Sequence, residues 1–498
     1  MRGDPSMATR TFESTLEAPA SAVWDWHVRP GAFLRLNPPF DPARIVEGGL
    51  VAEGSRARLR IQAGPVPVEW VAEHRRVVAG VGFDDVQIRG PFASWEHQHR
   101  ILPIDAGRSR LVDHLAYELP LGGLGELGGG AVIARKIERA FAYRHRLLME
   151  DLAAHARLAH TGPLTIAVTG ASGQVGRALV PYLTTGGHRV VVLRRPESGA
   201  QGIWSSLTPP PGVFPGVLEG TWDAGRGEIH LPEDVTLDAV VHLAGEPVGD
   251  KLWTDVQRMR IRTSRVEATR SLAEALAALP VRPKVLVCAS AIGYYGDRGV
   301  VSLDEAMPAG RGFLADICQG WEAAADPARE AGIRVVHTRL GIILTPEGGA
   351  LGRMLPVFRS GLGGNLGSGR QYWSWVSLED VVGAIHHAIA TEALSGPVNV
   401  VAPAPVTNAA FSEILARVLG RPRPLAHVPA IVLRAALGAF ADEMLLASAR
   451  VVPDRLIASG YRYRLAELER ALAVALGQFD WARLAREYPG KVRRELAA

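Results

Sequence analysis

Two hydrophobic periodicities divide the first third of the chain. Five segments alternate apolar and polar residues, as half-buried strands do: "TRTFESTLEAP", "SRARLRIQ", "VEWVAEHRRV", "ASWEHQHRIL" and "SRLVDHLAYELP". Between residues 131 and 157 the spacing becomes helical. The residues on its apolar face are Ile133, Ile137, Phe141, Leu148 and Leu152. We therefore predict an α+β domain over residues 8–157, in which a sheet wraps one long helix.

From residue 164 the pattern changes to short, almost wholly apolar runs. These are "LTIAVTG", "HRVVVLRR", "LDAVVHLAG", "PKVLVCASA" and "IRVVHTRLGIIL", and helical stretches lie between them. Strands of continuous Val, Ile and Leu are typical of a parallel sheet that helices cover on both faces. Residues 164–420 are therefore predicted to form an α/β domain with a doubly wound parallel sheet.

Composition and charge exclude several classes of protein. The chain has 498 residues, of which 47% are hydrophobic and 21% are charged, so two or three ordinary globular domains are expected. The net charge of +4 is small and scattered, which argues against a nucleic-acid partner. Two cysteines, Cys288 and Cys318, make no disulfide framework and no CxxC pair. With no apolar run long enough for a membrane span and no signal peptide, we expect a complete cytoplasmic protein.

Three glycines follow the first strand of the predicted parallel sheet. In "LTIAVTGASGQVG" they stand at 170, 173 and 176, between a strand and a helix. Gly170 then allows a tight turn, Gly173 lets the backbone approach a pyrophosphate, and Gly176 lets helix and strand pack closely. The helix N-terminus offers free N–H groups to the phosphates. Spacing and context together predict a dinucleotide site of Rossmann type.

The next strand ends in two arginines, Arg194 and Arg195. NAD-binding proteins usually carry an acid here, which holds the ribose 2′-hydroxyl. A carboxylate would repel a 2′-phosphate, whereas a guanidinium grips it with paired, charge-assisted hydrogen bonds. The arginines favour NADP(H) over NAD(H) as the cofactor. The alternative is two solvated arginines at a strand end.

With these residues in hand, the chain resembles the extended and atypical short-chain dehydrogenase/reductases, and among them an NAD-dependent epimerase-like family of the sugar-nucleotide epimerase type. The matching segments include "TGASGQVG", "VVHLAGEPVGDKLW", "SAIGYYGDRG", "TRLGIILTPEGGALGRML" and "GLGGNLGSGRQYWSWVSLEDVV", within residues 164–420. Residues 424–476 resemble that family's short C-terminal domain of unknown function, and residues 477–498 are left as a C-terminal tail. Residues 8–157 resemble a polyketide-cyclase-like (SRPBCC/START-like) domain, a helix-grip fold that often encloses an apolar ligand.

The resemblance implies a set of cofactor contacts. It assigns the pyrophosphate to the loop residues Gly170, Ser172, Gly173, Gln174, Val175 and Gly176. It places Arg194 at the 2′-phosphate. It places Leu243, Ala244 and Gly245 along the cofactor's ribose.

The usual proton relay of this superfamily is missing. Active members use a Tyr-x-x-x-Lys pair with a Ser or Thr, and the tyrosine moves a proton while the nicotinamide moves a hydride. The only place for that pair is "ADICQGWEAA", which has neither Tyr nor Lys. Glu322 lies there on a predicted helix, where a solvated position is the simpler reading. The usual hydroxyl position falls on Ser290 or Ala291.

Three residues are candidates for a replacement acid–base group: Ser290, Tyr294 and Lys251. Tyr294 follows the fourth strand at the carboxyl edge of the sheet, where ligands of open α/β sheets bind. Its neighbour Tyr295 matches a tyrosine that is often structural in this superfamily. Lys251 and Glu246 follow the third strand and could approach the same cleft, although each is as well explained as a surface residue.

The segment "GRQYWSWVSLEDV" carries two tryptophans, Trp373 and Trp375, before a helix start. They could stack on a flat or sugar-like ligand, and packing in the core explains them equally well. Ser377 and Asp380 have the spacing of a capping box, which accounts for Asp380 without a catalytic role.

Histidines gather in the front domain. Alternation in "SWEHQHRI" puts Trp95, His97 and His99 on one face of a strand, and His114 lies on the next strand. Three histidines could bind zinc, but no Cys or paired acid accompanies them in the sequence. Histidines that line a ligand cavity, or that are satisfied within the core, are favoured instead. We expect no metal.

Two classes of function fit these features. The first is an NADP(H)-dependent oxidoreductase or epimerase that acts on a small carbonyl- or sugar-like substrate, with a front domain that binds an apolar ligand. The second is a cofactor-binding sensor or scaffold without turnover, or a carrier of an apolar molecule. The retained cleft segments favour the first class, and the missing Tyr and Lys favour the second. The oligomeric state is left open.

Overall fold

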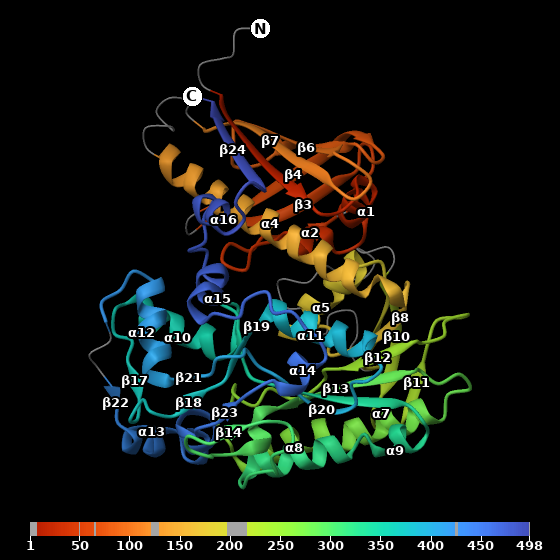
Figure 1. Ribbon diagram of the computed structural model, residues 1–498, viewed down its shortest axis with the longest axis vertical. Coiled ribbons are helices and arrows are strands. Elements are labelled where there is room, and N and C mark those ends of the chain that lie inside the picture. Colours follow the sequence, from red (N-terminus) through yellow and green to blue (C-terminus); the bar gives the residue numbers. More distant parts are fainter. Residues whose placement is uncertain are drawn as a thin grey trace.

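Two eight-stranded sheets form the bulk of the protein. The computed structural model describes residues 7–48, 50–63, 66–120, 129–196, 217–423 and 427–497. In Figure 1 the first sheet lies at the top in red and orange, and the second lies in the larger body below it. The long helix α4 (Ala131–Leu158) runs between them.

The first sheet wraps α4, as the mixed periodicities predict. Its order is β2-β3-β4-β5-β6-β7-β1-β24, and every neighbouring pair is antiparallel. The strands are β1 (Ala8–Leu16), β2 (Arg44–Glu47), β3 (Arg56–Ala63), β4 (Val66–Val78), β5 (Gly82–Arg89), β6 (Ser94–Pro103), β7 (Ser109–Glu118) and β24 (Val492–Ala497). Phe12 of β1 stacks on Phe141 of α4 at 4.5 Å between ring centroids. Helices α1 (Ala20–Val28) and α2 (Ala32–Arg35) complete this part.

The end of the chain returns to this first sheet. Strand β24, blue in Figure 1, pairs antiparallel with β1. Helix α16 (Trp481–Glu487) precedes it, and its Trp481 lies 4.9 Å from Phe12 between ring centroids. Residues 477–498 were expected as a tail, but residues 481–497 within them supply an edge strand and a core residue to the front domain.

The second sheet confirms the predicted doubly wound architecture. Its order is β11-β10-β9-β8-β12-β13-β15-β20, and all neighbours are parallel except β10 and β11. The strands are β8 (Thr165–Thr169), β9 (Arg189–Arg194), β10 (Val217–Asp223), β11 (Glu228–His230), β12 (Ala239–His242), β13 (Val285–Ala291), β15 (Arg334–Leu340) and β20 (Gly396–Val400). The strand order reverses between β8 and β12, which is where such sheets bind ligands.

Helices cover both faces of this sheet, so its strands are apolar throughout. Helices α5 (Gln174–Thr185) and α11 (Leu378–Ala390) share one core with one face, and α7 (Ala268–Ala277) and α9 (Asp326–Glu330) lie on the other. Helix α6 (Asp255–Arg262) continues through a π-helical turn (Thr263–Glu267) into α7, and α8 (Phe313–Ala323) precedes α9.

The remaining helices and strands form smaller units. They are β14 (Ser302–Leu303), β16 (Ile342–Leu344), α10 (Gly349–Arg359), β17 (Asn365–Leu366), β18 (Tyr372–Trp373), β19 (Trp375–Ser377), β21 (Val406–Thr407), α12 (Asn408–Val418), β22 (His427–Val428), α13 (Ala430–Leu437), β23 (Arg450–Val451), α14 (Asp454–Ala458) and α15 (Leu468–Ala475). Their strands pair in two-stranded sheets: β14-β23, β16-β19, β17-β22 and β18-β21. Trp373 and Trp375 are buried among these elements, which decides for core packing over ligand stacking.

The predicted capping box at the start of α11 is confirmed and has a second role. The Ser377 hydroxyl accepts from the Asp380 backbone N–H at 2.9 Å. The buried Asp380 carboxylate in turn accepts from the backbone N–H groups of Arg464 (2.8 Å) and Leu465 (3.1 Å). The cap thus also holds the C-terminal segment.

Buried ion pairs join the parts through α4. The side chain of Asp151 is 0% exposed and binds Arg35 of α2 at 2.8 and 2.9 Å and Arg464 of the C-terminal segment at 2.6 Å. One turn earlier, Arg146 binds Glu379 of α11 at 2.6 and 3.0 Å. Burial alone would raise the pKa of Asp151, but Arg35 and Arg464 outweigh it and hold that pKa below its ordinary value.

We expect Asp151→Asn to destabilise the protein by about 3–5 kcal/mol, because it leaves two buried guanidinium groups without their carboxylate. Denaturant unfolding measures the change. The matched control is Asp25→Asn, which breaks the half-exposed Asp25–Arg29 pair and should cost about 0–1 kcal/mol.

The same variant has a pH signature of defined sign. The lowered pKa of Asp151 contributes stability above the unfolded pKa, and this contribution is lost as the pH falls through the folded value. The difference between wild type and Asp151→Asn should therefore shrink below about pH 4. A constant difference down to acid unfolding would contradict this account.

Candidate cofactor and active site

The glycine loop between β8 and α5 is shaped by missing side chains. Gly170 has a φ of +68°, and a Cβ there would lie 2.7 Å from the backbone nitrogen of Ala244. A Cβ on Gly176 would lie 2.4 Å from the carbonyl oxygen of Gly170. These are the tight turn and the close helix–strand packing that a dinucleotide loop requires. The residues present fit such a cofactor.

Helix α5 begins directly at the loop. Gly173 is its N-cap and donates its N–H to the Gly170 carbonyl at 3.0 Å. Ser172 is exposed and Val175 packs against the sheet core, so Val175 could meet a phosphate only through its backbone. The side chain of Gln174 lies against Gly348, where an added Cβ would be 2.3 Å from Nε2.

The segment after β12 closes over the glycine loop. The backbone N–H of Leu243 donates to the Thr169 hydroxyl at 3.2 Å, and that hydroxyl is hydrogen-bonded to His242 at 2.7 Å. A Cβ on Gly245 would lie 3.3 Å from the Arg265 guanidinium carbon. Leu243, Ala244 and Gly245, predicted along the ribose, thus lie beside the loop predicted to hold the pyrophosphate.

Arg194 already has an acidic partner. It ends β9 and its Nη2 lies 2.5 Å from Oε1 of Glu219 on the adjacent strand β10. Arg195 follows it and is exposed. Glu219 could not be found from the sequence, because the pairing depends on the register of two parallel strands. A 2′-phosphate at this position would compete with a carboxylate for the guanidinium.

A cluster of polar side chains lies at the carboxyl ends of β13 and β15. The Ser290 hydroxyl donates to Oε1 of Glu322 at 2.8 Å. Arg339 of β15 donates from Nε and Nη2 to the two oxygens of Glu322, each at 2.8 Å. The Arg339 guanidinium carbon also lies 3.5 Å from the ring centroid of Tyr294, which stands on a short 3-10 turn (Ile292–Tyr295) after β13. Ser290 and Tyr294 are therefore joined through one ion pair.

Glu322 is engaged in this ion pair, and its side chain is 13% exposed, so the expectation of a solvated helix face is wrong. Cys318 and Glu322 have the i, i+4 spacing of the absent Tyr-x-x-x-Lys pair. Burial raises the pKa of the Cys318 thiol to about 12, so this thiol stays protonated. Burial would lower the pKa of Arg339, but Glu322 outweighs it and raises that pKa.

Tyr295 also contacts the cluster, since its hydroxyl accepts from Nη1 of Arg339 at 2.9 Å, whereas Lys251 has a separate partner. Tyr295 donates its hydroxyl to Asn399 Oδ1 at 2.8 Å, and burial raises its pKa to about 12, which suits a structural residue. Lys251 is exposed, and its Nζ lies 3.3 Å from Oε1 of Glu246. Within the described part of the chain, no recorded contact joins Lys251 to Ser290 or Tyr294.

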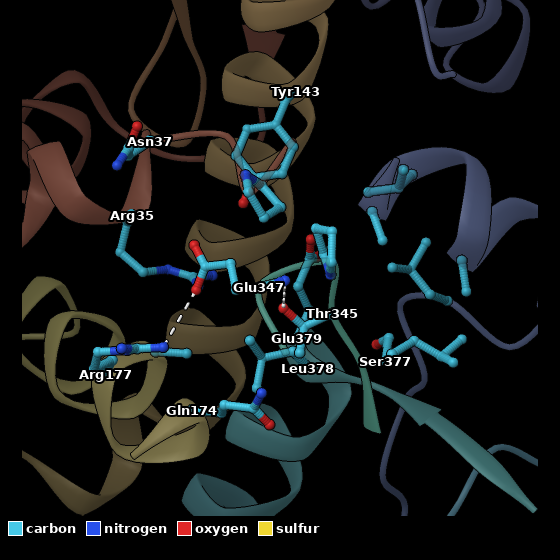
Figure 2. Close-up of a pocket in the computed structure, with 18 of the residues that line it drawn as sticks. Arg35, Asn37, Tyr143, Gln174, Arg177, Thr345, Glu347, Ser377, Leu378 and Glu379 are labelled. Carbon is cyan, nitrogen blue, oxygen red and sulfur yellow. Dashed lines mark hydrogen bonds and ion pairs between the residues drawn. The ribbon is translucent and has the colours of Figure 1, made fainter. Parts of the chain in front are cut away.

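A small pocket of about 130 Å³ lies where the front domain meets the glycine-loop helix. Figure 2 shows Arg35 and Tyr143 facing Gln174, Arg177 and Glu347 across it. Nη2 of Arg177 lies 3.5 Å from Oε2 of Glu347, whose pKa burial raises. Through Gln174 the pocket adjoins the cofactor loop.

The front domain encloses a larger cavity of about 460 Å³ between its sheet and α4. Most of its lining is apolar and aromatic, including Trp70, Phe83, Phe92, Trp95 and Phe141. Such a volume and lining suit a small apolar molecule.

The histidines of the front domain divide between the two faces of its sheet. His97 and His99 line the cavity. His114 pairs in register with Gln98 and so lies on the opposite face, hydrogen-bonded to Thr11 at 2.9 Å. His114 therefore cannot complete a metal site with His97 and His99.

Comparison with known proteins assigns each part of the chain. Residues 166–401 match the NAD dependent epimerase/dehydratase family, residues 428–475 a domain of unknown function (DUF1731), and residues 16–141 the family of polyketide cyclase/dehydrase and lipid transport proteins. An epimerase family protein of Mycobacterium bovis is 41% identical over 312 residues, which are 62% of this chain and 97% of the relative.

The chain belongs to the epimerase family.

Two solved structures are similar to this chain, one over nearly its full length and one over about two thirds of it. A nucleoside-diphosphate sugar epimerase from Corynebacterium glutamicum covers 96% of this chain and 92% of its own, with 32% identity and a TM-score of 0.74. A human epimerase family protein, SDR39U1 (isoform 2), solved with NADPH, covers 63% of this chain and 99% of its own, with 33% identity and a TM-score of 0.54. The predicted resemblance and the Rossmann and START-like folds are confirmed. None of the helices in the described residues is long and apolar enough to span a membrane.

We expect Gly176→Ala to abolish high-affinity dinucleotide binding in this epimerase family protein, because the new Cβ forces α5 away from the loop. The strain should also cost about 1–3 kcal/mol of stability. NADPH fluorescence titration and denaturant unfolding measure both effects. Gly107→Ala is the control, since its Cβ would meet only Asp105 at 3.9 Å; equal binding by the two variants would contradict the loop's role.

Proposed function

We propose that the protein is an NADP(H)-dependent oxidoreductase or epimerase of atypical short-chain dehydrogenase/reductase type. Its substrate is a small carbonyl- or sugar-like molecule, and its front domain binds an apolar ligand. The observation that carries the proposal is the Ser290–Glu322–Arg339–Tyr294 cluster at the carboxyl edge of the sheet, on strands β13 and β15 that follow the cofactor segment.

The cofactor half of the proposal has three supports. The glycine loop has the shape that a dinucleotide requires, and a human relative was solved with NADPH. Arg194 has a guanidinium at the strand end where NAD-binding proteins usually carry an acidic residue. In this proposal the loop holds the pyrophosphate, Arg194 and Arg195 hold the 2′-phosphate, and Leu243, Ala244 and Gly245 line the ribose. The bound cofactor supplies or accepts a hydride at its nicotinamide.

The proton half is assigned to Tyr294. Its hydroxyl belongs to the one half-buried tyrosine of the cluster, whereas the neighbouring Tyr295 is fully buried and bonded to Asn399. Arg339 fixes the Tyr294 ring from one face, and Glu322 fixes Arg339 with two hydrogen bonds. In this proposal Ser290, whose proton is bound to the same carboxylate, orients the substrate by accepting a hydrogen bond from it. Lys251 has no comparable position in the proposal.

A second function, cofactor sensing without turnover, is favoured by one observation. In place of the Tyr and Lys of the usual pair, the chain has Cys318 and Glu322. The Cys318 thiol is buried and protonated, and the Glu322 carboxylate is ion-paired. Neither group is set to exchange a proton with a substrate. In that case the cluster is structural, and ligand binding rather than chemistry is the output.

Arg194→Ala should weaken NADPH binding about ten- to a hundredfold, since charge-assisted hydrogen bonds to the phosphate are lost, and should leave NADH binding unchanged. Glu219→Gln should tighten NADPH binding, because it removes the carboxylate that competes for Arg194. Fluorescence titration with both nucleotides measures this. Arg189→Ala, at the exposed opposite end of β9, is the control. Equal loss for NADPH and NADH would refute recognition of the 2′-phosphate.

Tyr294→Phe should lower kcat about a hundredfold or more with NADPH affinity unchanged, because it removes the hydroxyl and keeps the ring against Arg339. The assay follows NADPH oxidation with a panel of small carbonyl compounds and sugar nucleotides. Tyr372→Phe, which changes a tyrosine that lies against Arg450 instead of Arg339, serves as the unchanged reference. If wild type binds NADPH tightly but neither it nor the variant turns over any substrate in the panel, the sensor function gains the stronger support.

A further inference from the structure

Two histidines and a carboxylate converge at one end of the front-domain cavity. His97 and His99 lie on the same face of β6, and Asp85 of β5 stands opposite His97 in register. Oδ2 of Asp85 lies 3.3 Å from Nε2 of His99 and 4.0 Å from Nδ1 of His97. One ligand atom from each of the three residues lies within 4.8 Å of the others. Ligand atoms around a tetrahedral zinc ion lie about 3.3 Å apart, so small side-chain movements suffice.

A second carboxylate holds the far sides of both histidine rings. Asp113 of β7 is buried, and its Oδ1 lies 3.2 Å from Nε2 of His97 and 2.7 Å from Nδ1 of His99. Its other oxygen, Oδ2, lies 2.8 Å from Nε2 of His145 on α4. An outer carboxylate that accepts the distal N–H of each ligating histidine is the usual support of a metal site, because it fixes the ring and turns the other nitrogen's lone pair toward the metal.

The ligating carboxylate is itself oriented. Oδ1 of Asp85 lies 3.2 Å from Nε2 of His74, whose Nδ1 is 2.9 Å from the Ser55 hydroxyl. The other oxygen, Oδ2, is the one that faces His97 and His99. Asp113 therefore supports both histidines, and His74 supports Asp85.

We propose that Asp85, His97 and His99 bind a divalent transition metal ion of the zinc type, with at least one coordination position open to the cavity. Two imidazole nitrogens and one carboxylate oxygen are the donor set of exchangeable and catalytic metal sites, which keep a position free for water or a ligand. All three residues line the cavity. The site is independent of the cofactor loop, which lies in the other sheet.

The free coordination position on the metal indicates which class of ligand the cavity would bind. This step rests on the front domain's proposed role in binding an apolar molecule. The ligand would place an apolar body among Trp70, Phe92 and Trp95 and a carboxylate or hydroxyl oxygen on the metal. Arg144 also lines the cavity and favours an anionic head group.

Cobalt(II) titration of the full-length protein tests the site directly. The affinity tag is removed, and the protein is treated with a chelator and dialysed before the titration. Tetra- or five-coordinate Co²⁺ gives visible absorption bands, so stoichiometry and affinity come from one experiment, and competition with Zn²⁺ follows. We expect one equivalent of Co²⁺ to bind with such bands and to be displaced by Zn²⁺.

Four variants locate the ion. His97→Ala and Asp85→Asn should each lower the affinity at least a hundredfold, and Asp85→Asn keeps the shape of the side chain if the histidine variant fails to fold. Asp113→Asn removes only the outer support and should cost about 10- to 100-fold. His114→Ala, on the opposite face of the sheet, should bind as wild type does.

Two results would overturn the proposal: no Co²⁺ binding by the wild type, or equal binding by wild type and Asp85→Asn. NADPH titration of the same samples reports on the fold and on the cofactor site separately. A protein that binds Co²⁺ but not NADPH would count against the proposed enzyme and support the metal site. A protein that binds NADPH but not Co²⁺ would count against the metal site and leave the proposed enzyme unaffected.

Discussion

The arrangement of the whole molecule depends on one buried carboxylate. Asp151 lies on α4 with no solvent exposure, and it accepts from Arg35 of the front domain and Arg464 of the C-terminal segment. A charge removed from water must be neutralised by partners in good geometry, or it costs several kcal/mol. Two cations from opposite ends of the sequence can meet that demand only when the front domain, α4 and the C-terminal segment are all in place. The ion pairs therefore fix one arrangement where apolar contacts alone would tolerate several.

Helix α4 makes this constraint relevant to both candidate sites. Phe141 of α4 lines the front-domain cavity, and His145 lies beside Asp113. Further along α4, Arg146 binds Glu379 of the Rossmann part, and Asp151 binds Arg35 of the front domain and Arg464 of the C-terminal segment. The front domain also touches the cofactor helix directly, since a Cβ on Gly31 would lie 2.7 Å from Pro181 in α5. A ligand that displaced α4 in the cavity would disturb buried ion pairs next to the cofactor helix. The two sites are connected mechanically through α4 and the ion pairs that it makes with its neighbours.

Features that depend on the spacing of residues along the chain could be predicted from the sequence. Contacts that depend on strand register could not. Gly170, Gly173 and Gly176 carry their meaning in their spacing, and the apolar runs identify the parallel sheet because such strands are buried on both faces. Arg194 pairs with Glu219 on a neighbouring strand, and Glu322 pairs with Arg339 on another element. The spacing of residues along the sequence reveals neither partner. Sequence spacing likewise does not reveal that Asp85 and Asp113 lie beside His97 and His99. Nor does it reveal that β24, near the end of the chain, pairs with β1. A one-residue register change would have put His114 on the cavity face, and only the fold decides it.

The cluster at Glu322 shows how a lost catalytic pair constrains what replaces it. Glu322 stands where the lysine of the Tyr-x-x-x-Lys pair would stand. Its carboxylate needs a cation nearby, and Arg339 of β15 supplies one through two hydrogen bonds. The positive charge of the cleft is thereby retained but moved from helix α8 to strand β15, where the guanidinium lies against the face of Tyr294. The position on α8 with the spacing of the absent tyrosine holds the buried Cys318 thiol, which stays protonated, so a proton donor that works with this charge is expected on the β13 side of the cleft. Among the described residues of that side, Ser290, Tyr294 and Tyr295 carry hydroxyl groups. Ser290 already gives its proton to Glu322, and the buried Tyr295 gives its proton to Asn399 while it accepts from Arg339. The proposed chemistry therefore depends on the hydroxyl group of Tyr294.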